Sequence, residues 1–252
     1  MNKHINTVDL SINNFSLKEG DYKKYEHIKE KQLQVSGDGA LYMKGELHNN
    51  ARIHINFMKS NGSRVFIGDN FRGNIIVRIS GNNSIVYIGE KNILNGVKIR
   101  SFQDNDLIAT GSQVTVTQDN TWISGDGAGE GNPAIIIGDD CMLAENVIIR
   151  NSDAHPIFKR NGEQSNYSKS LVHIEPHVWL CQDVRVLKDV KIGACSIVGL
   201  GSIVTKNAPR FSITTGVPGK SKINKDIYWS RSDGTKAKKQ AEYFFKKYNN
   251  VN

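Results

Sequence analysis

The most regular feature of the chain is a hydrophobic position that returns every six residues between residues 174 and 209. Large aliphatic residues open the hexapeptides, at Ile174, Leu180, Val186, Ile192, Val198 and Val204. Small or β-branched residues stand four positions later, at Val178, Val184, Val190, Ser196, Ser202 and Ala208. A helix repeats about every 3.6 residues and a strand every two, so neither explains a period of six. Three short strands per turn do, which predicts an all-β parallel solenoid with coils of about 18 residues and three flat faces.

The same spacing occurs earlier, at Ile137, Leu143 and Ile149, and then breaks. Counting on by six places His155 where an inward aliphatic residue is due. The next clean repeat, Ile174, comes one position later than two such coils after Ile137 would place it. The break therefore predicts an inserted polar loop over residues 156–172, with His155 at its root.

The remaining segments are less regular. Short β-like stretches between Gly- and Asn-rich turns fill residues 47–133, and Ile67 and Ile88 occupy similar contexts somewhat more than three hexapeptides apart, so we interpret them as degenerate coils. Residues 235–248 carry an apolar stripe at helical spacing. A short helix is also expected over residues 16–32. The predicted organisation is an N-terminal extension (1–46), degenerate coils (47–133), a regular β-helix with its loop (134–223) and a helical C-terminal tail (224–252).

Composition narrows the choice of partner. The net charge of +8 and the pI near 9.3 favour an anionic partner. No helix-turn-helix, zinc-finger or RNA-binding signature accompanies the charge, so we expect no nucleic acid partner. An acidic sugar polymer and the phosphates of coenzyme A fit the charge equally well. The alternative is that the excess is solvated lysine on the terminal segments, such as Lys236, Lys238 and Lys239.

Cysteine usage and hydropathy set further bounds. No stretch approaches about 18 uninterrupted apolar residues, so we expect no membrane span and a cytoplasmic location. Cys141, Cys181 and Cys195 are an odd number without a Cys-x-x-Cys pair, which argues against a disulfide framework and a thiolate metal site. Cys141 and Cys195 fall on repeat positions, where small residues fill the wall.

Between residues 135 and 223 the chain resembles the hexapeptide-repeat acyltransferases, whose fold is a left-handed β-helix. The resemblance rests on Asp153-Ala154-His155-Pro156, His177-Val178-Trp179-Leu180, Val204-Thr205-Lys206 and Gly216-Val217-Pro218-Gly219-Lys220. Within that family it looks most like O-acetyltransferases of bacterial capsular polysaccharides, of the polysialic acid type. The resemblance implies acetyl-CoA as co-substrate, a homotrimer with active sites between subunits, and a bacterial cytoplasmic location near the inner-membrane capsule assembly machinery.

His155 is the expected catalytic base. A sugar hydroxyl is almost wholly protonated at neutral pH, and histidine, with an ordinary pKa of about 6.5, is well placed to accept its proton. The resembling enzymes use the histidine of this motif in that role. Asp153 lies two residues earlier and is expected to orient the imidazole or hold the acceptor; a capping or turn role is the alternative.

The resemblance also implies a binding site for acetyl-CoA. Trp179, the second expected catalytic residue, directly precedes the inward Leu180, so it should point off the wall, where it would pack on the pantetheine arm or help to place the thioester carbonyl. The matching cofactor-binding positions are Gln182, Leu200, Gly201, Thr205, Lys206 and Lys220. Leu200 and Lys220 depart from the sugar acetyltransferase pattern, which often has a small residue and an arginine there.

The expected function is O-acetylation of a sugar hydroxyl in an acidic capsular polysaccharide, by direct transfer from acetyl-CoA and without a metal. A nucleotide-sugar or small-sugar or antibiotic acetyltransferase of the same fold is the alternative. A zinc carbonic anhydrase of this fold would use three histidines, for which His155, His173 and His177 are the candidates. The last two lie four positions apart, whereas that pattern needs five.

Overall fold

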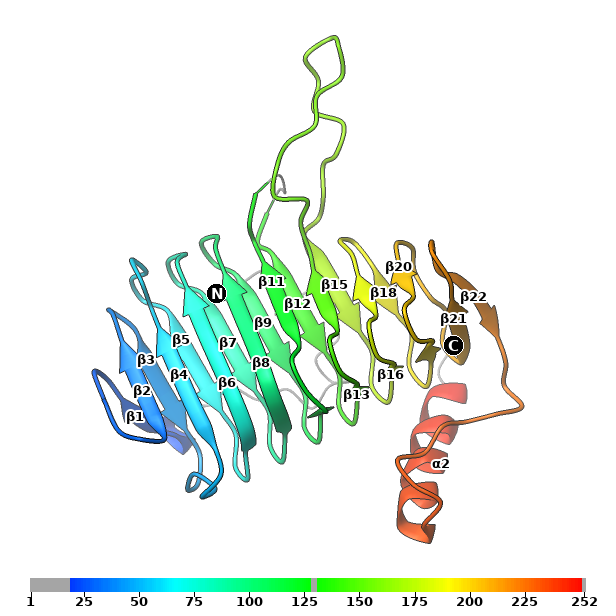
Figure 1. The fold of residues 1–252 in the computed structure, drawn as a ribbon, viewed down its shortest axis with the longest axis horizontal. Coiled ribbons are helices and arrows are strands. Elements are labelled where there is room, and N and C mark those ends of the chain that lie inside the picture. The colour runs from blue at the N-terminus through cyan, green and yellow to red at the C-terminus, as the bar shows by residue number, and fades with distance from the viewer. Residues whose placement is uncertain (1–18, 128–130, 251–252) are drawn as a thin grey trace.

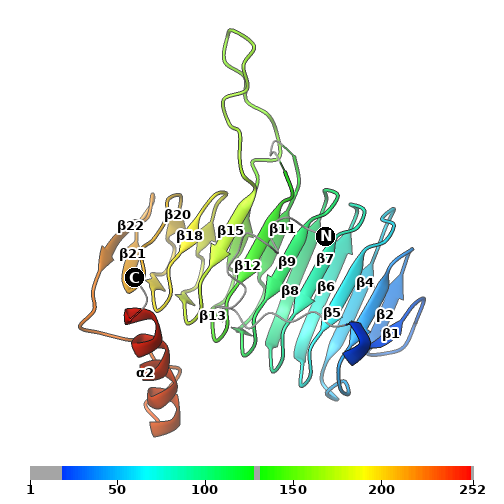
Figure 2. The same ribbon diagram turned by 180° about the vertical axis from the view of Figure 1, so that it is seen from behind.

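The computed structural model describes residues 19–127 and 131–250, which form an elongated solenoid (Figure 1). Successive coils stack along the long axis, and apart from the antiparallel end strands β1 and β22 the strands pair in parallel with the equivalent strands of the next coil. The predicted all-β class, a left-handed parallel β-helix, is confirmed. A long loop stands away from the body, and a helix lies beside the C-terminal coils (Figure 2).

Three faces enclose the core, and the first is a sheet of its own. Within the described residues this sheet has eight strands. In spatial order they are β1 (Lys23–Tyr25), β3 (Ala40–Met43), β5 (Arg64–Ile67), β7 (Ile85–Ile88), β9 (Leu107–Thr110), β12 (Ala134–Ile137), β15 (Leu171–Ile174) and β18 (Lys191–Ile192).

The second and third faces form one branched sheet. Its N-terminal strands are β2 (Leu33–Ser36), β4 (Arg52–Asn56), β6 (Arg72–Ile79) and β8 (Ile93–Ser101). From β8 the second face continues through β10 (Thr115–Val116), β13 (Met142–Leu143), β16 (Trp179–Leu180), β19 (Ile197–Val198), β21 (Ser212–Thr215) and β22 (Lys220–Ile223). The third face continues through β11 (Thr121–Ser124), β14 (Ile148–Arg150), β17 (Arg185–Val186) and β20 (Ile203–Val204).

The hexapeptide positions line the core as predicted. The aliphatic residues that open the six repeats, from Ile174 to Val204, are all buried, and so are the residues four positions later, from Val178 to Ala208. The earlier Ile137, Leu143 and Ile149 are buried too. Burying each such side chain contributes about 1.5–3 kcal/mol relative to its exposed form, so this row supplies much of the stability of the coils.

Coil length divides the solenoid into two regions. In the wide coils, residues 33–124, Ile67 pairs with Ile88 and Ile88 with Thr110, so each coil is longer than three hexapeptides and the second step is one position longer than the first. In the narrow coils, residues 171–215, Ile174 pairs with Ile192, and a coil is three hexapeptides long. Between them lies the loop-bearing coil, residues 134–170. Strands β6 and β8 turn the corner between the second and third faces without a break, and the corner of β6 falls at Gly73, whose φ is 101°.

The N-terminal region differs from the sequence-based prediction in its secondary structure. Residues 16–18 lie outside the described residues, and the rest of the predicted 16–32 helix is a 3₁₀ turn, η1 (Glu19–Asp21), followed by β1. Lys23–Tyr25 forms a strand and not a helix because it pairs antiparallel with β3. Strands β2 and β3 already belong to coils, although they fall inside the predicted extension 1–46.

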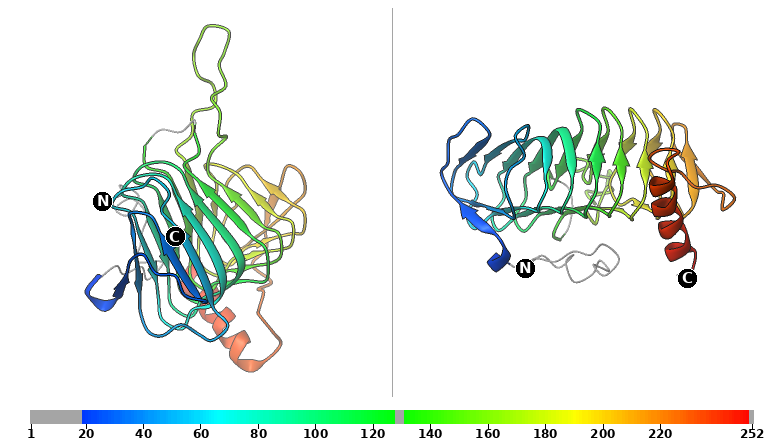
Figure 3. Two further views of the ribbon diagram at one scale, coloured as in Figure 1. Left: turned by 60° about the vertical axis from the view of Figure 1, so that its left-hand side comes forward. Right: turned by 90° about the horizontal axis from the view of Figure 1, so that it is seen from below.

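The C-terminal helix is confirmed as α2 (Thr235–Asn249). Its buried residues are Ala241, Phe244 and Tyr248, and the last two pack with Ala194, Cys195 and Phe211 of the C-terminal coils. The helix lies alongside those coils (Figure 3). Phe245 packs against Phe211 of the last coil with ring centroids 5.0 Å apart. No helix among the described residues has the length and apolar content needed to cross a bilayer.

Candidate active site

The loop that interrupts the repeats spans residues 151–170 and joins the third face to the first face (Figure 1). It starts earlier than the predicted 156 because β14 ends at Arg150. It also ends earlier than the predicted 172, because Val172 is buried and pairs with Ile135 in the first face. Ile137 pairs with Ile174, so the chain between them makes one coil with a long excursion, not two coils.

His155 lies exposed at the foot of this loop, and its backbone is held on both sides. Its amide donates to the Asp153 carbonyl at 2.8 Å, and its carbonyl accepts a hydrogen bond from Asn166 Nδ2 at 2.9 Å. The preceding Ala154 has a φ of 66°, a left-handed conformation that is uncommon for a residue with a side chain. The imidazole is thus presented to solvent from a fixed backbone at the corner between the third and first faces.

The Asp153 carboxylate is held by two other residues. Asn166 Nδ2 donates to Asp153 Oδ2 at 3.0 Å, and Lys188, from the corner one coil further on, forms an ion pair with the same oxygen. Partial burial raises the pKa of Asp153, but the hydrogen bonds from Lys188 and Asn166 outweigh it and hold the pKa below its usual value. The carboxylate therefore stays ionised and ties the loop to the next coil. Its predicted orienting role towards His155 remains a prediction.

A buried amide closes the root of the loop. Asn151 Nδ2 donates to Ser124 Oγ at 2.7 Å and to the Ser170 carbonyl at 2.8 Å, and Asn151 Oδ1 accepts from the Gly125 amide at 3.1 Å. Ser124 Oγ in turn donates to Asp106 at 2.5 Å. Asn151 thereby connects the first residue of the loop with its last residue, below His155.

Trp179 lies on the second face, not at the loop corner. Its neighbour Leu180 is buried in the core and Trp179 is half-buried on the outside, as the alternation predicted. The indole lies 6.2 Å from the ring of Trp229, which comes from the C-terminal tail. The tail thus borders the surface on which Trp179 stands.

The contacts through which the tail docks were not visible in the sequence. His177 is buried and stacks on Trp229 at 4.1 Å, and its Nδ1 lies 2.7 Å from Asp140 Oδ2. Arg231 Nε donates to the other oxygen of Asp140 at 2.8 Å. The contacting residues are 37 to 91 positions apart, so only the fold brings them together. The only sequence signal was His177 itself, within the motif that contains Trp179.

The predicted cofactor-binding residues divide between two corners. Gln182, Leu200 and Gly201 lie at the corner between the second and third faces, where the Gly201 amide donates to the Gln182 carbonyl at 2.9 Å. Lys220 opens β22 beside the same corner, opposite Thr215. The other two, Thr205 and Lys206, follow β20 and therefore lie at the corner between the third and first faces, two coils beyond His155.

One chain does not bring the predicted catalytic residues together. None of the hydrogen bonds, ion pairs or ring contacts of residues 19–127 and 131–250 joins His155 to Trp179, and the third face lies between the His155 corner and the second face, which carries Trp179. The three histidines considered for zinc also lie in different environments. The Nε2 atom of His177 lies 3.2 Å from the Trp229 carbonyl, while burial lowers the pKa of His173 to about 4. Across the described residues no group of three or more His, Cys, Asp or Glu side chains is placed to hold a metal ion.

Comparison with known proteins gives partial matches. No model of a protein family matches the chain. The polysialic acid O-acetyltransferase of Escherichia coli O1:K1 is 33% identical over 130 residues, which are 51% of this chain and 42% of that protein. The protein of the same name from Neisseria meningitidis is 33% identical over 132 residues, 51% of this chain and 57% of its own length. The chain thus spans about half the length of the curated relatives it matches.

Another sequence relative and one solved structure extend the comparison. The galactoside O-acetyltransferase of Lactococcus lactis is 37% identical over 107 residues, 40% of this chain and 50% of that protein. The crystal structure of the polySia-specific acetyltransferase NeuO aligns with a TM-score of 0.57 and 24% identity, covering 81% of this chain and all of that one, and shows a shared fold. The chain therefore resembles the hexapeptide-repeat acetyltransferases, and among them the polysialic acid O-acetyltransferases.

Proposed function

We propose that the protein is an O-acetyltransferase that moves the acetyl group of acetyl-CoA to a hydroxyl group of an acidic bacterial polysaccharide. The observation that carries this proposal is the position of His155: a titratable, exposed side chain on a fixed backbone, at the break of the hexapeptide repeat. The sequence similarity to proteins named polysialic acid O-acetyltransferase supports the acetyl donor chemistry and an acidic acceptor.

The donor is expected on the opposite side of the third face from His155. Trp179, Gln182, Leu200, Gly201 and Lys220 offer an indole, an amide, an open backbone and a cation for a long ligand that ends in phosphates. A Cβ on Gly201 would meet no atom within 4 Å, so the backbone there is open to a ligand. Lys220 supplies a point charge suited to phosphate.

The separation of the two sets of residues supports a site between subunits. Since one chain holds its His155 corner and its Trp179 surface on the second face apart, a complete site needs the His155 corner of one copy against the Trp179 surface of another. Each such contact joins two different patches, so repeated contacts can close into a ring. A ring of three copies is a homotrimer, the assembly that the resemblance implies. Thr205 and Lys206, on the His155 corner, would then reach the donor bound to the neighbouring copy.

Within such a site the transfer is a direct displacement. The imidazole of His155 accepts the hydroxyl proton as the sugar oxygen attacks the thioester carbonyl carbon, and collapse of the tetrahedral intermediate breaks the carbon–sulfur bond. The proton held by His155 then passes to the departing CoA sulfur. The protein carries no covalent acetyl intermediate, and the histidine is restored in each cycle. Because acetyl-CoA is an intracellular metabolite, the activity belongs in the bacterial cytoplasm, near the membrane machinery that assembles capsule.

The test is release of free thiol from acetyl-CoA, measured with acidic and neutral polysaccharides, sugar nucleotides and small sugars as acceptors. Removing a general base costs typically about 10²- to 10⁴-fold in rate, so His155→Ala should lose that much turnover with an unchanged melting temperature. His48→Ala, which removes another exposed histidine far from the loop, is the matched control.

Each outcome decides between stated alternatives. Thiol release that depends on an acidic polymer and is lost in His155→Ala supports the proposal. Release with only a sugar nucleotide or a small sugar favours the alternative acetyltransferase, to which the similarity to the galactoside O-acetyltransferase points. Full activity in His155→Ala would rule out the proposed base.

A further inference from the structure

The outer surface of the third face carries a row of cations over the wide coils. Parallel pairing places Arg78 of β6 directly beside Arg100 of β8, and Ile76 beside Lys98. Neighbouring strands are about 4.8 Å apart, so three positive side chains share a small area. All three are exposed, and each makes no ion pair or side-chain hydrogen bond within the described residues. Like charges side by side on adjacent strands destabilise a sheet. This arrangement therefore lowers the stability of the fold, and no ion pair of these three residues within the described chain offsets the loss.

No carboxylate compensates these charges along the row. The strands β2, β4, β6, β8, β11 and β14 contain neither Asp nor Glu. Among residues 19–127 and 131–250, the ion pair of the row is that of Arg150 with Asp126, at its far end. The result is a positive surface whose strands present no negative side chain to a bound anion.

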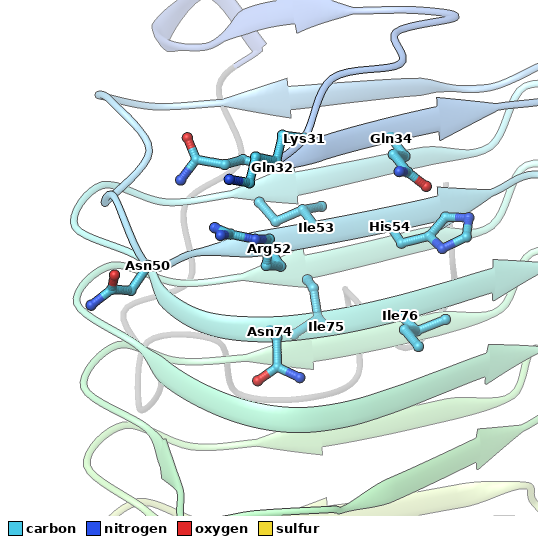
Figure 4. Close-up of a pocket in the computed structure, with 10 residues that line it drawn as sticks. All are labelled: Lys31, Gln32, Gln34, Asn50, Arg52, Ile53, His54, Asn74, Ile75 and Ile76. Carbon is cyan, nitrogen blue, oxygen red and sulfur yellow. The ribbon is translucent and has the colours of Figure 1, made fainter.

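The surface is also hollowed, and neighbouring hollows share lining residues. One of about 510 Å³ lies over β2, β4 and β6, where Gln34, His54 and Ile76 stand in a row across three strands (Figure 4). A second, of about 180 Å³, shares Ile76 and adds Arg78, Lys98 and Arg100. A third, of about 360 Å³, shares both arginines.

Exposed apolar side chains border the cations. Met58 and Phe102 line the third hollow together with the two arginines, and Ile76 lies between the other two. A sugar ring offers carbon-bound hydrogens on its faces and, in an acidic glycan, a carboxylate at its edge. Apolar contacts with a few placed cations suit such a ligand, and arginine binds carboxylates in a bidentate manner.

The row leads towards His155. From β4 it crosses β6, β8 and β11 to β14, four strand spacings or about 19 Å. β14 ends at Arg150, and the chain then enters the loop that carries His155. A polymer lying along the row would therefore reach the proposed catalytic corner with one of its units.

We propose that this surface, the third-face groove, binds an acidic polysaccharide and delivers it to His155; this assignment rests on the proposed acetyltransferase function. A nucleic acid is the less favoured occupant. Single strands need aromatic platforms for successive bases, and the described lining of the three hollows offers only the rings of Phe102 and His54. The groove distinguishes acceptors by charge and length, separately from the chemistry at His155.

The test is direct binding, which does not depend on turnover. Fluorescently labelled polysialic acid of long and short chain length is titrated with wild type and with the triple variant Arg78→Gln, Lys98→Gln, Arg100→Gln. Three surface contacts of about 0.5 kcal/mol each give about a tenfold rise in Kd for the long polymer. Raising the salt concentration should weaken wild type more than the variant. The triple variant Lys236→Gln, Lys238→Gln, Lys239→Gln loses the same charge from α2 and is the matched control.

The outcomes separate the groove from the function. Loss of long-polymer binding in the groove variant and not in the control supports the proposal, and in the transfer assay it should appear as a raised KM with kcat retained. Equal binding by both variants overturns it, even if the enzyme acetylates sugars. Tighter binding of labelled single-stranded DNA than of polysialic acid, lost in the groove variant, reassigns the groove to nucleic acid. Groove-dependent polymer binding without any acetyl transfer would sink the proposed function alone.

Discussion

The wide and narrow coils use the same inward row of aliphatic residues but differ in what they present outside. The narrow coils have two-residue strands from β16 to β20 and tight corners, so most of their outer surface is turn, and the predicted donor residues stand at these corners or on the short β16. The wide coils have strands of up to nine residues, which form a broad sheet face with the third-face groove. A slightly longer coil therefore converts a turn-rich surface into a strand-rich one. A short period favours a site built on corners, and a longer period favours a surface for an extended ligand.

Buried carboxyl groups follow the same division. In the narrow coils Glu175 bonds to Arg210 Nε at 2.6 Å and to Lys191 at 2.8 Å. Burial raises the pKa of Glu175, but these partners outweigh it and lower the pKa to about 2. In the wide coils Asp106 is bonded by the Ser124 hydroxyl, and burial raises the pKa of Asp106 to about 7. One region thus buries an ionised carboxylate, and the other buries a carboxyl group that keeps its proton up to about pH 7.

The largest expected effect on stability is at Glu175. Replacing it with alanine leaves the buried Ala194 amide without its acceptor and separates Arg210 and Lys191 from their counter-charge. Loss of one partner of a buried pair costs about 3 kcal/mol in the free energy of unfolding, measured by urea denaturation at neutral pH. Glu175→Gln, which keeps the size and one acceptor, should lose less. Equal losses for the two variants would show that packing, not the ion pairs, closes the narrow coils.

A smaller loss is expected at the boundary between the two regions, for Asn151→Ala. The variant leaves the Gly125 amide and the Ser170 carbonyl without their partner, at a cost of about 1–3 kcal/mol. Because Asn151 joins both ends of the loop, acetyl transfer should fall more than acetyl-CoA binding. The exposed Asn161, at the tip of the loop, serves as the control, and Asn161→Ala should change the free energy of unfolding by less than about 0.5 kcal/mol. If acetyl transfer is unchanged in Asn151→Ala, the loop root does not position His155.

The last prediction is a difference in pH dependence between the two carboxyl groups. Since its folded pKa is raised, Asp106 contributes stability that is present below its ordinary pKa of 3.8 and is lost as pH rises to about 7. Glu175, whose folded pKa is lowered, contributes stability present above 4.5 and lost as pH falls to about 2. The melting temperature of Asp106→Asn relative to wild type should therefore increase from about pH 4 to about pH 7. If the melting temperatures of the variant and wild type change with pH in the same way, Asp106 is ionised in the folded protein.

The narrow coils and His155 were predictable because their information is local. Every sixth residue of the narrow coils faces the core, so the period survives in the sequence and its break exposes His155. The wide coils vary in length from one to the next, and β6 and β8 cross a corner without a turn signal, so no fixed period marks them. Their outward cations Arg78 and Arg100 are a whole coil apart in the chain and become neighbours only through the pairing of β6 with β8.

Parts of the candidate site depended on long-range contacts and were missed for that reason. Asn166 and Lys188 hold Asp153 from 13 and 35 residues away, through an irregular loop and the next coil. The tail contacts Asp140 and His177 across 91 and 52 residues, and no sequence repeat predicts these contacts. Such contacts come from the stacking of coils, which the hexapeptide pattern predicts only in outline.

The parallel register of the third-face groove has a consequence for how such proteins diverge. Each coil adds one strand to the groove and leaves the coil of His155 untouched, so gain or loss of a wide coil changes the reach of the groove by about 4.8 Å without altering the reacting corner. On the proposed function, acceptor length preference and the chemical step would be carried by separate, stackable coils, and duplication or deletion of a coil would change the first while the second stays constant.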